Sequence, residues 1–126
     1  MEKIFSNNMS RFKKSFRFAV HGLRYAFQNE RNFRIESAIA LGILILAFVL
    51  ELSLLEKSIL LVMCAVVLGM ELANTALERV IDMLKPRVHP YARIVKDVMA
   101  GAVLLVSFVA VLIGVLIFLP HLLVQV

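Results

Sequence analysis

Polar residues recur at helical spacing along one otherwise apolar stretch of the sequence. They are spaced by three, four and four residues. On an α-helix such positions fall within about 80° of one another, so the side chains form a single narrow stripe. Three carboxylates and an amide on one helix face could bind a cation, transfer a proton, or do both. The stripe consists of Glu71, Asn74, Glu78 and Asp82.

The surroundings of Glu71 argue against a purely structural role for its carboxylate. The twelve residues before it, 59–70, contain no charged side chain. An acid within a membrane-spanning helix costs about 2.5–3.5 kcal/mol on insertion scales. The alternative is a structural role, in which the carboxylate forms hydrogen bonds that hold two helices together. We expect chemistry instead, because other charged residues accompany the stripe.

Further charged residues stand at the ends of the apolar segments. Glu30 lies in the polar run 29–32, and Lys96 and Asp97 immediately precede the last apolar segment. Carboxylate oxygens of this kind suit Mg²⁺, which usually takes one or two carboxylates together with substrate phosphates. The five glycines form neither a Walker phosphate loop nor a protein-kinase glycine loop. A nucleotide site would therefore be built from side chains on helices.

The composition indicates that these helices lie in lipid rather than in water. Hydrophobic residues make up 61% of the 126 residues and charged residues only 18%. This balance favours an integral membrane protein. We expect an all-α fold in a single domain, 1–126, with three transmembrane helices over about 35–52, 58–84 and 97–119. Pro120 is expected to end the last helix.

The N-terminal segment is amphipathic and basic. Apolar residues at a spacing of three or four, from Phe12 to Phe27, predict a helix over about 10–28 that lies in the membrane interface. The first 34 residues contain eight Lys or Arg and two acids. This charge suits an anionic membrane surface or a phosphate-bearing substrate, and we expect no nucleic-acid partner.

The distribution of basic residues predicts the orientation of the chain in the cell membrane. Lys and Arg concentrate in the N-terminal segment and in residues 79–96, whereas the loop between the first two spans has Lys57 alone. The positive-inside rule places the basic segments, including the N-terminus, in the cytoplasm.

Together these features resemble the prokaryotic diacylglycerol kinase family over nearly the whole chain. The resemblance is carried by the stripe from Glu71 to Asp82 and by the segments Gly22–Arg24, Asn29–Glu30, Lys96–Asp97 and Gly101–Val103. Segments 30–33, 51–53, 89–90 and 118–120 look most like its undecaprenol kinase branch.

The resemblance implies an ATP- and Mg²⁺-dependent lipid kinase that assembles as a homotrimer. The acceptor would be the primary hydroxyl of undecaprenol, which we favour, or of diacylglycerol. Glu71 would be the catalytic base, and Glu30 and Glu78 would bind Mg²⁺. Arg34 and Glu36 are assigned to the lipid substrate. The expected nucleotide contacts are Arg11, Lys14, Arg17, Asn74, Asp82, Lys96 and Asp97.

Two other functions fit part of the pattern. A small proton- or cation-coupled transporter subunit would explain Glu71 but not the acids that gather beside Lys96. A non-catalytic assembly subunit would tolerate alanine throughout the stripe. Phosphorylation of a lipid by the purified protein separates both from a kinase.

The predicted orientation can be tested by labelling cysteines introduced at Ser53 and at Val88 in a chain whose Cys64 is replaced by alanine. An impermeant maleimide should reach the two positions from opposite sides of the membrane. Labelling of both from the same side would contradict the predicted topology.

Overall fold

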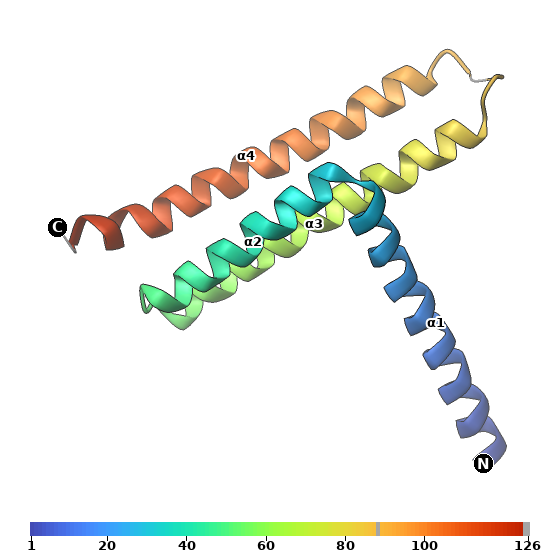
Figure 1. The fold of residues 1–126 in the computed structure, drawn as a ribbon, viewed down its shortest axis with the longest axis horizontal. Helices are drawn as coiled ribbons and strands as arrows, with labels where there is room; N and C mark the ends of the chain where they lie inside the picture. Colours follow the sequence, from blue (N-terminus) through green and yellow to red (C-terminus); the bar gives the residue numbers. More distant parts are fainter. Residues whose placement is uncertain (88, 125–126) are drawn as a thin grey trace. The chain divides into compact units, whose positions relative to one another are not determined.

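The chain forms four helices and, among the described residues, no β-strand (Figure 1). The structure is a computed structural model that describes residues 1–87 and 89–124; Val88 therefore lies outside the described residues. The helices are α1 (Glu2–Asn29), α2 (Arg31–Val49), α3 (Leu54–Met83) and α4 (Ala92–Val124). The expected all-α fold is confirmed. The chain divides into two compact units, Met1–Arg31 and Asn32–Val126.

The first unit contains α1, an amphipathic helix that begins earlier than the periodicity predicts. Polar residues around Asn7 obscure the pattern, but no glycine or proline interrupts the first 21 residues. The Ser10 hydroxyl donates to the Asn7 carbonyl at 2.9 Å, so this polar side chain is satisfied within the helix. At the other end, the Asn29 side-chain amide donates to the Tyr25 carbonyl at 2.8 Å. Glu30 then adopts an extended conformation and ends the helix.

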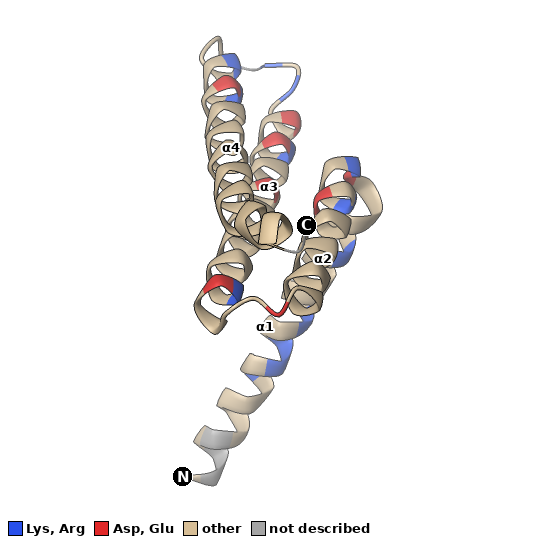
Figure 2. Cartoon of the chain, turned by 90° about the vertical axis from the view of Figure 1, so that its left-hand side faces the viewer, with Lys and Arg blue, Asp and Glu red and all other residues tan. Residues whose placement is uncertain are grey.

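In the second unit, α2, α3 and α4 are each long and apolar enough to cross a membrane. The first and last residues of each helix differ by a few positions from those of the expected span, as helix ends commonly do. Figure 2 shows the charged residues of these helices concentrated near the helix ends. Hydrocarbon cannot form hydrogen bonds with peptide groups, so the backbone hydrogen bonds within each helix satisfy them instead.

A short turn joins α2 to α3 and leaves the last residues of the first expected span outside the helix. Glu51 adopts a left-handed conformation with φ of 52°, and the Leu52 amide donates back to the Ala47 carbonyl at 3.1 Å. Ser53 then caps α3 in a reciprocal capping box with Glu56. The Ser53 hydroxyl accepts from the Glu56 amide at 3.2 Å, and the Glu56 carboxylate accepts from the Ser53 amide at 2.8 Å. This pair satisfies donors that a helix start leaves unpaired.

The hydrophobic core lies at this turn. Ala47, Leu52 and Leu60 are 0–3% exposed and form one cluster, against which Ile117 and Phe118 of α4 pack. The cluster therefore connects all three spans at one end of the unit. We call this the turn end, and the opposite end, at the α3–α4 connection, the basic end. Most other apolar side chains of the spans remain exposed in the single chain, as expected for helices solvated by lipid or by neighbouring helices.

The expectation that Pro120 ends the last helix is wrong, because α4 continues to Val124. Proline lacks an N–H group and disturbs the helix behind it. In a membrane, ending the helix here would expose several unpaired peptide groups to hydrocarbon. Continuing the helix costs less free energy than that exposure. The ring of His121 adds a local contact, with Nδ1 placed 2.9 Å from the Ile117 carbonyl oxygen.

Candidate functional site

The polar stripe predicted on the second span lies on one uninterrupted helix. All four of its residues belong to α3, which is helical from Leu54 to Met83. Glu71 is the most enclosed, with 4% of its surface exposed. Asn74 and Glu78 are half-buried, and the Asp82 side chain is 39% exposed. Exposure therefore rises along the stripe from the middle of the helix toward the basic end.

The length of α3 fixes the depth of each acid. At 1.5 Å per residue, Glu71 lies roughly 26 Å from Leu54 and about 10 Å from Glu78. The hydrocarbon core of a bilayer is about 30 Å thick. With Leu54 near one surface, Glu71 lies just inside the opposite hydrocarbon boundary and Glu78 lies beyond it. A lipid hydroxyl and a water-borne nucleotide could meet at that boundary.

Helix α2 brings a second carboxylate to Glu71. Glu36 interacts electrostatically with Glu71, although the two residues are far apart in the sequence. The Glu36 Oε2 atom is buried and has no hydrogen-bond partner among the described residues. A buried polar atom without a partner costs about 1–3 kcal/mol. This oxygen is therefore available to a donor that is not part of the chain, such as a hydroxyl group.

Glu36 also lines a cavity of about 580 Å³ between α2, α3 and α4. The wall is almost entirely apolar and includes Leu68 of α3 and Val111 of α4. Small residues of α4, Ala110 and Gly114, leave room along it. Ligand pockets commonly have volumes of about 300–1,000 Å³ and apolar walls with a few polar groups. The cavity thus combines an apolar lining with one carboxylate.

At the basic end, Asp82 is surrounded by cations. Its carboxylate lies 2.8 Å from Lys85 Nζ and 3.8 Å from an Arg79 guanidinium nitrogen. It also interacts electrostatically with Lys96 of α4. The end of α3 and the start of α4 therefore form one charged cluster, which contains two of the expected nucleotide contacts. Because the Asp82 carboxylate already pairs with Lys85, it is better suited to positioning basic side chains than to binding a metal ion.

The remaining expected residues lie near helix ends. In the second unit, Arg34 is exposed on the first turn of α2, Lys96 is half-buried and Asp97 is exposed. In the first unit, Glu30 is half-buried directly after α1. The three basic residues Arg11, Lys14 and Arg17 are exposed on α1, within about 120° of one another around the helix.

The described residues contain no cluster of three or more His, Cys, Asp or Glu side chains that could hold a metal ion alone. A nucleotide-bound Mg²⁺ needs only one or two carboxylates from the protein. Glu78 fits that requirement. It is half-buried, lies toward the basic end, and forms no ion pair with another described residue.

Two features of the site escaped the sequence analysis. Thr75 is 7% exposed and lies one turn from Glu71, so it is a second buried polar residue on this part of α3. Its spacing of four from Glu71 was a usable signal. The proximity of Glu36 to Glu71 left no signal in the sequence, because it depends on how α2 pairs with α3.

Comparisons with known proteins show the family of the chain. Residues 17–118 match the family described as prokaryotic diacylglycerol kinase. The chain is similar to an undecaprenol kinase of Bacillus subtilis (strain 168), with 40% identity over 92% of this chain and 94% of that protein. It is 41% identical to a diacylglycerol kinase of Synechocystis sp. over 86% of this chain and 63% of that protein. A diacylglycerol kinase of Escherichia coli (strain K12) is 29% identical over 85% and 88% of the two chains.

The family match covers most of the chain, including α2, α3 and nearly all of α4. It decides between the functions that the polar stripe left open, because the matched proteins are lipid kinases and not transporters. ATP is the phosphoryl donor that a kinase implies. The chain belongs to the prokaryotic diacylglycerol kinase family and is a multi-pass membrane lipid kinase, an undecaprenol kinase or a diacylglycerol kinase.

Proposed function

We propose that this kinase transfers the γ-phosphoryl group of ATP to the primary hydroxyl of undecaprenol, with Glu71 as the general base. The alcohol oxygen forms a bond to the γ-phosphorus, the bond from that phosphorus to ADP breaks, and Glu71 takes the alcohol proton. The products are the lipid phosphate and ADP. The observation that carries the proposal is the burial of Glu71, 4% exposed, in the middle of an apolar helix.

Glu36 and the adjacent cavity support a lipid alcohol as the acceptor. The unpartnered Oε2 of Glu36 could accept a hydrogen bond from the alcohol before Glu71 removes its proton. The apolar chain of the lipid could then lie in the cavity between α2, α3 and α4. This arrangement would hold the hydroxyl near Glu71, and such positioning supplies much of the catalysis in phosphoryl transfer.

Charged residues toward the basic end suit the nucleotide. Lys96 lies beside Asp82 there, and Arg79 and Lys85 add positive charge. Glu78 would hold the Mg²⁺, and Glu30 remains a second proposed metal ligand. When bound, that ion neutralises charge on the phosphates of ATP. Asn74 lies between Glu71 and Glu78 on the stripe, where its amide would orient the group in transfer. Asp97, Arg11, Lys14 and Arg17 remain proposed nucleotide contacts, and Arg34 a proposed contact of the lipid.

A homotrimer with its basic end in the cytoplasm completes the proposal. Three spans form a thin wall, and most of their apolar side chains are exposed in the single chain. Neighbouring subunits would cover part of that surface and help to exclude water from Glu71. The cytoplasmic placement of the basic end follows from the positive-inside rule and supplies ATP from the correct side.

The choice of lipid is tested by offering both acceptors to the same preparation. In mixed micelles that contain Mg²⁺ and ATP, we expect kcat/KM for undecaprenol to exceed that for a diacylglycerol by at least tenfold, about 1.4 kcal/mol in transition-state binding. The relative named undecaprenol kinase motivates this direction. Equal values, or a preference for diacylglycerol, would reverse the assignment of the acceptor while leaving the lipid kinase in place.

The role of Glu71 is tested by Glu71→Gln, which keeps the shape of the side chain but cannot take the proton. We expect turnover to fall roughly 10²–10⁴-fold, the usual effect of losing a general base, with ATP binding retained. The matched control is Glu51→Gln, at an exposed acid in the turn between α2 and α3. Turnover should be expressed per assembled oligomer, so that a folding defect is not mistaken for lost chemistry. A Glu71→Gln enzyme within threefold of wild type would exclude the residue as the base.

The metal site is tested by Glu30→Gln and Glu78→Gln. Each variant should need more Mg²⁺ for half-maximal activity, because it removes one charged oxygen ligand. Both should leave the oligomer intact on size-exclusion chromatography, and Glu51→Gln again serves as the control. A variant whose Mg²⁺ dependence is unchanged would remove that residue from the proposed metal site.

A further inference from the structure

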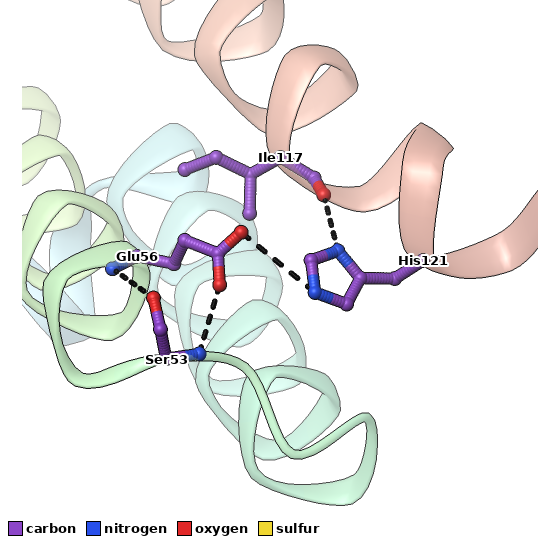
Figure 3. A network of polar contacts seen from close by, with 4 residues as sticks. All are labelled: Ser53, Glu56, Ile117 and His121. Carbon is purple, nitrogen blue, oxygen red and sulfur yellow. Dashed lines mark hydrogen bonds and ion pairs between the residues drawn. The ribbon is translucent and has the colours of Figure 1, made fainter. Parts of the chain in front are cut away.

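A polar network at the turn end connects α3 with α4, far from the stripe around Glu71 (Figure 3). His121 of α4 places Nε2 at 3.7 Å from Oε1 of Glu56, in the first turn of α3. Its other ring nitrogen, Nδ1, lies 2.9 Å from the carbonyl oxygen of Ile117. Both side chains are partly shielded, with 32% of His121 and 28% of Glu56 exposed.

The two neighbours of the imidazole ring are both hydrogen-bond acceptors. A neutral imidazole carries one N–H group, so it can donate to Ile117 but then turns a lone pair toward the Glu56 carboxylate. Only the doubly protonated imidazolium presents N–H groups in both directions. The two contacts together therefore favour the imidazolium, which can donate to Ile117 and form an ion pair with Glu56.

Glu56 is held in place independently of His121. Its Oε2 atom accepts the Ser53 amide at 2.8 Å in the capping box, which fixes the carboxylate and directs Oε1 toward α4. An ion pair usually gains little when two flexible side chains must be ordered to form it. Here the capping box has already ordered one of the partners.

No other described charge at the turn end forms an ion pair with His121. Among residues 1–87 and 89–124, the remaining charged side chains there are Glu51, in the turn, and Lys57, on α3. Lys57 Nζ lies over the ring of Phe48, 4.6 Å from its centroid, and so is directed to α2. The last turns of α2 and α4 contribute no other charged side chain.

We propose that Glu56 and His121 form a proton-dependent clamp that closes α4 onto α3 at the turn end. The clamp needs an imidazolium and a carboxylate, and histidine is the side chain whose charge commonly changes between about pH 5 and pH 8. A neutral imidazole cannot form the ion pair. Because Leu60, Phe118 and Leu122 line the cavity close to the pair, the clamp also sets the spacing of α3 and α4 at that end of the cavity. This inference does not depend on the proposed acceptor or base.

The test is a double-mutant cycle that removes the charges but keeps the local hydrogen bonds. Glu56→Gln retains an N3 residue that is compatible with a capping box. His121→Asn retains a donor for the carbonyl four residues back, as Asn29 shows with Tyr25 at 2.8 Å. The apparent melting temperature of the full-length protein is measured in a non-ionic detergent at pH 5.5 and pH 8.0 for wild type, both single variants and the double variant.

At pH 5.5 each single variant should melt roughly 2–4 °C below wild type, and the double variant no lower than either single variant. At pH 8.0 this coupling should disappear. His21 and His89 are present in all four proteins, so their contributions cancel in the cycle. Additive effects at pH 5.5, or a coupling of the same size at both pH values, would overturn the clamp.

Discussion

Hydrocarbon offers no hydrogen-bond partner to a peptide group and little solvation to a charge, and the second unit of this kinase is arranged around both facts. Its chain crosses the apolar region only as helices. The turn between α2 and α3 is capped by reciprocal bonds between Ser53 and Glu56. Where Pro120 removes a donor, the helix still continues to Val124. The same constraint makes an acid within a span costly unless the protein or a ligand satisfies its carboxylate.

Glu71 is the residue in which that cost is most visible. It is nearly inaccessible, and α2 adds the Glu36 carboxylate beside it. Two neighbouring acids in an apolar region are unfavourable unless protons, cations or donors are shared between them. In the proposed function, a lipid alcohol would supply a donor at that depth, whereas ATP and Mg²⁺ would stay in the more polar region around Glu78 and Lys96. The proposal thus separates the two substrates along one helix and puts the transfer between Glu71 and Glu78.

The sequence was sufficient for the number of helices and for the stripe on α3, because both depend on periodicity and hydropathy within one segment. Helix ends were less predictable: α1 begins about eight residues before the predicted start, and α4 passes Pro120. Polar residues such as Asn7 weaken an amphipathic pattern without breaking a helix. The electrostatic interaction between Glu36 and Glu71 requires the pairing of two helices, and neither helix alone encodes which of its residues will lie near the other.

The acids Glu56 and Glu36 show why hydrogen-bond partners separate structural from functional carboxylates more clearly than position does. Both lie near the N-terminal end of a membrane-spanning helix and both are partly buried. One Glu56 oxygen accepts the Ser53 amide and the other faces His121, so the carboxylate is satisfied by the protein. Glu36 instead keeps a buried oxygen with no partner among the described residues. Such an oxygen costs free energy in the folded chain, and this cost supports the proposed role of Glu36 in binding a ligand that supplies the missing donor. In a lipid kinase, the acceptor hydroxyl has the chemistry for that role.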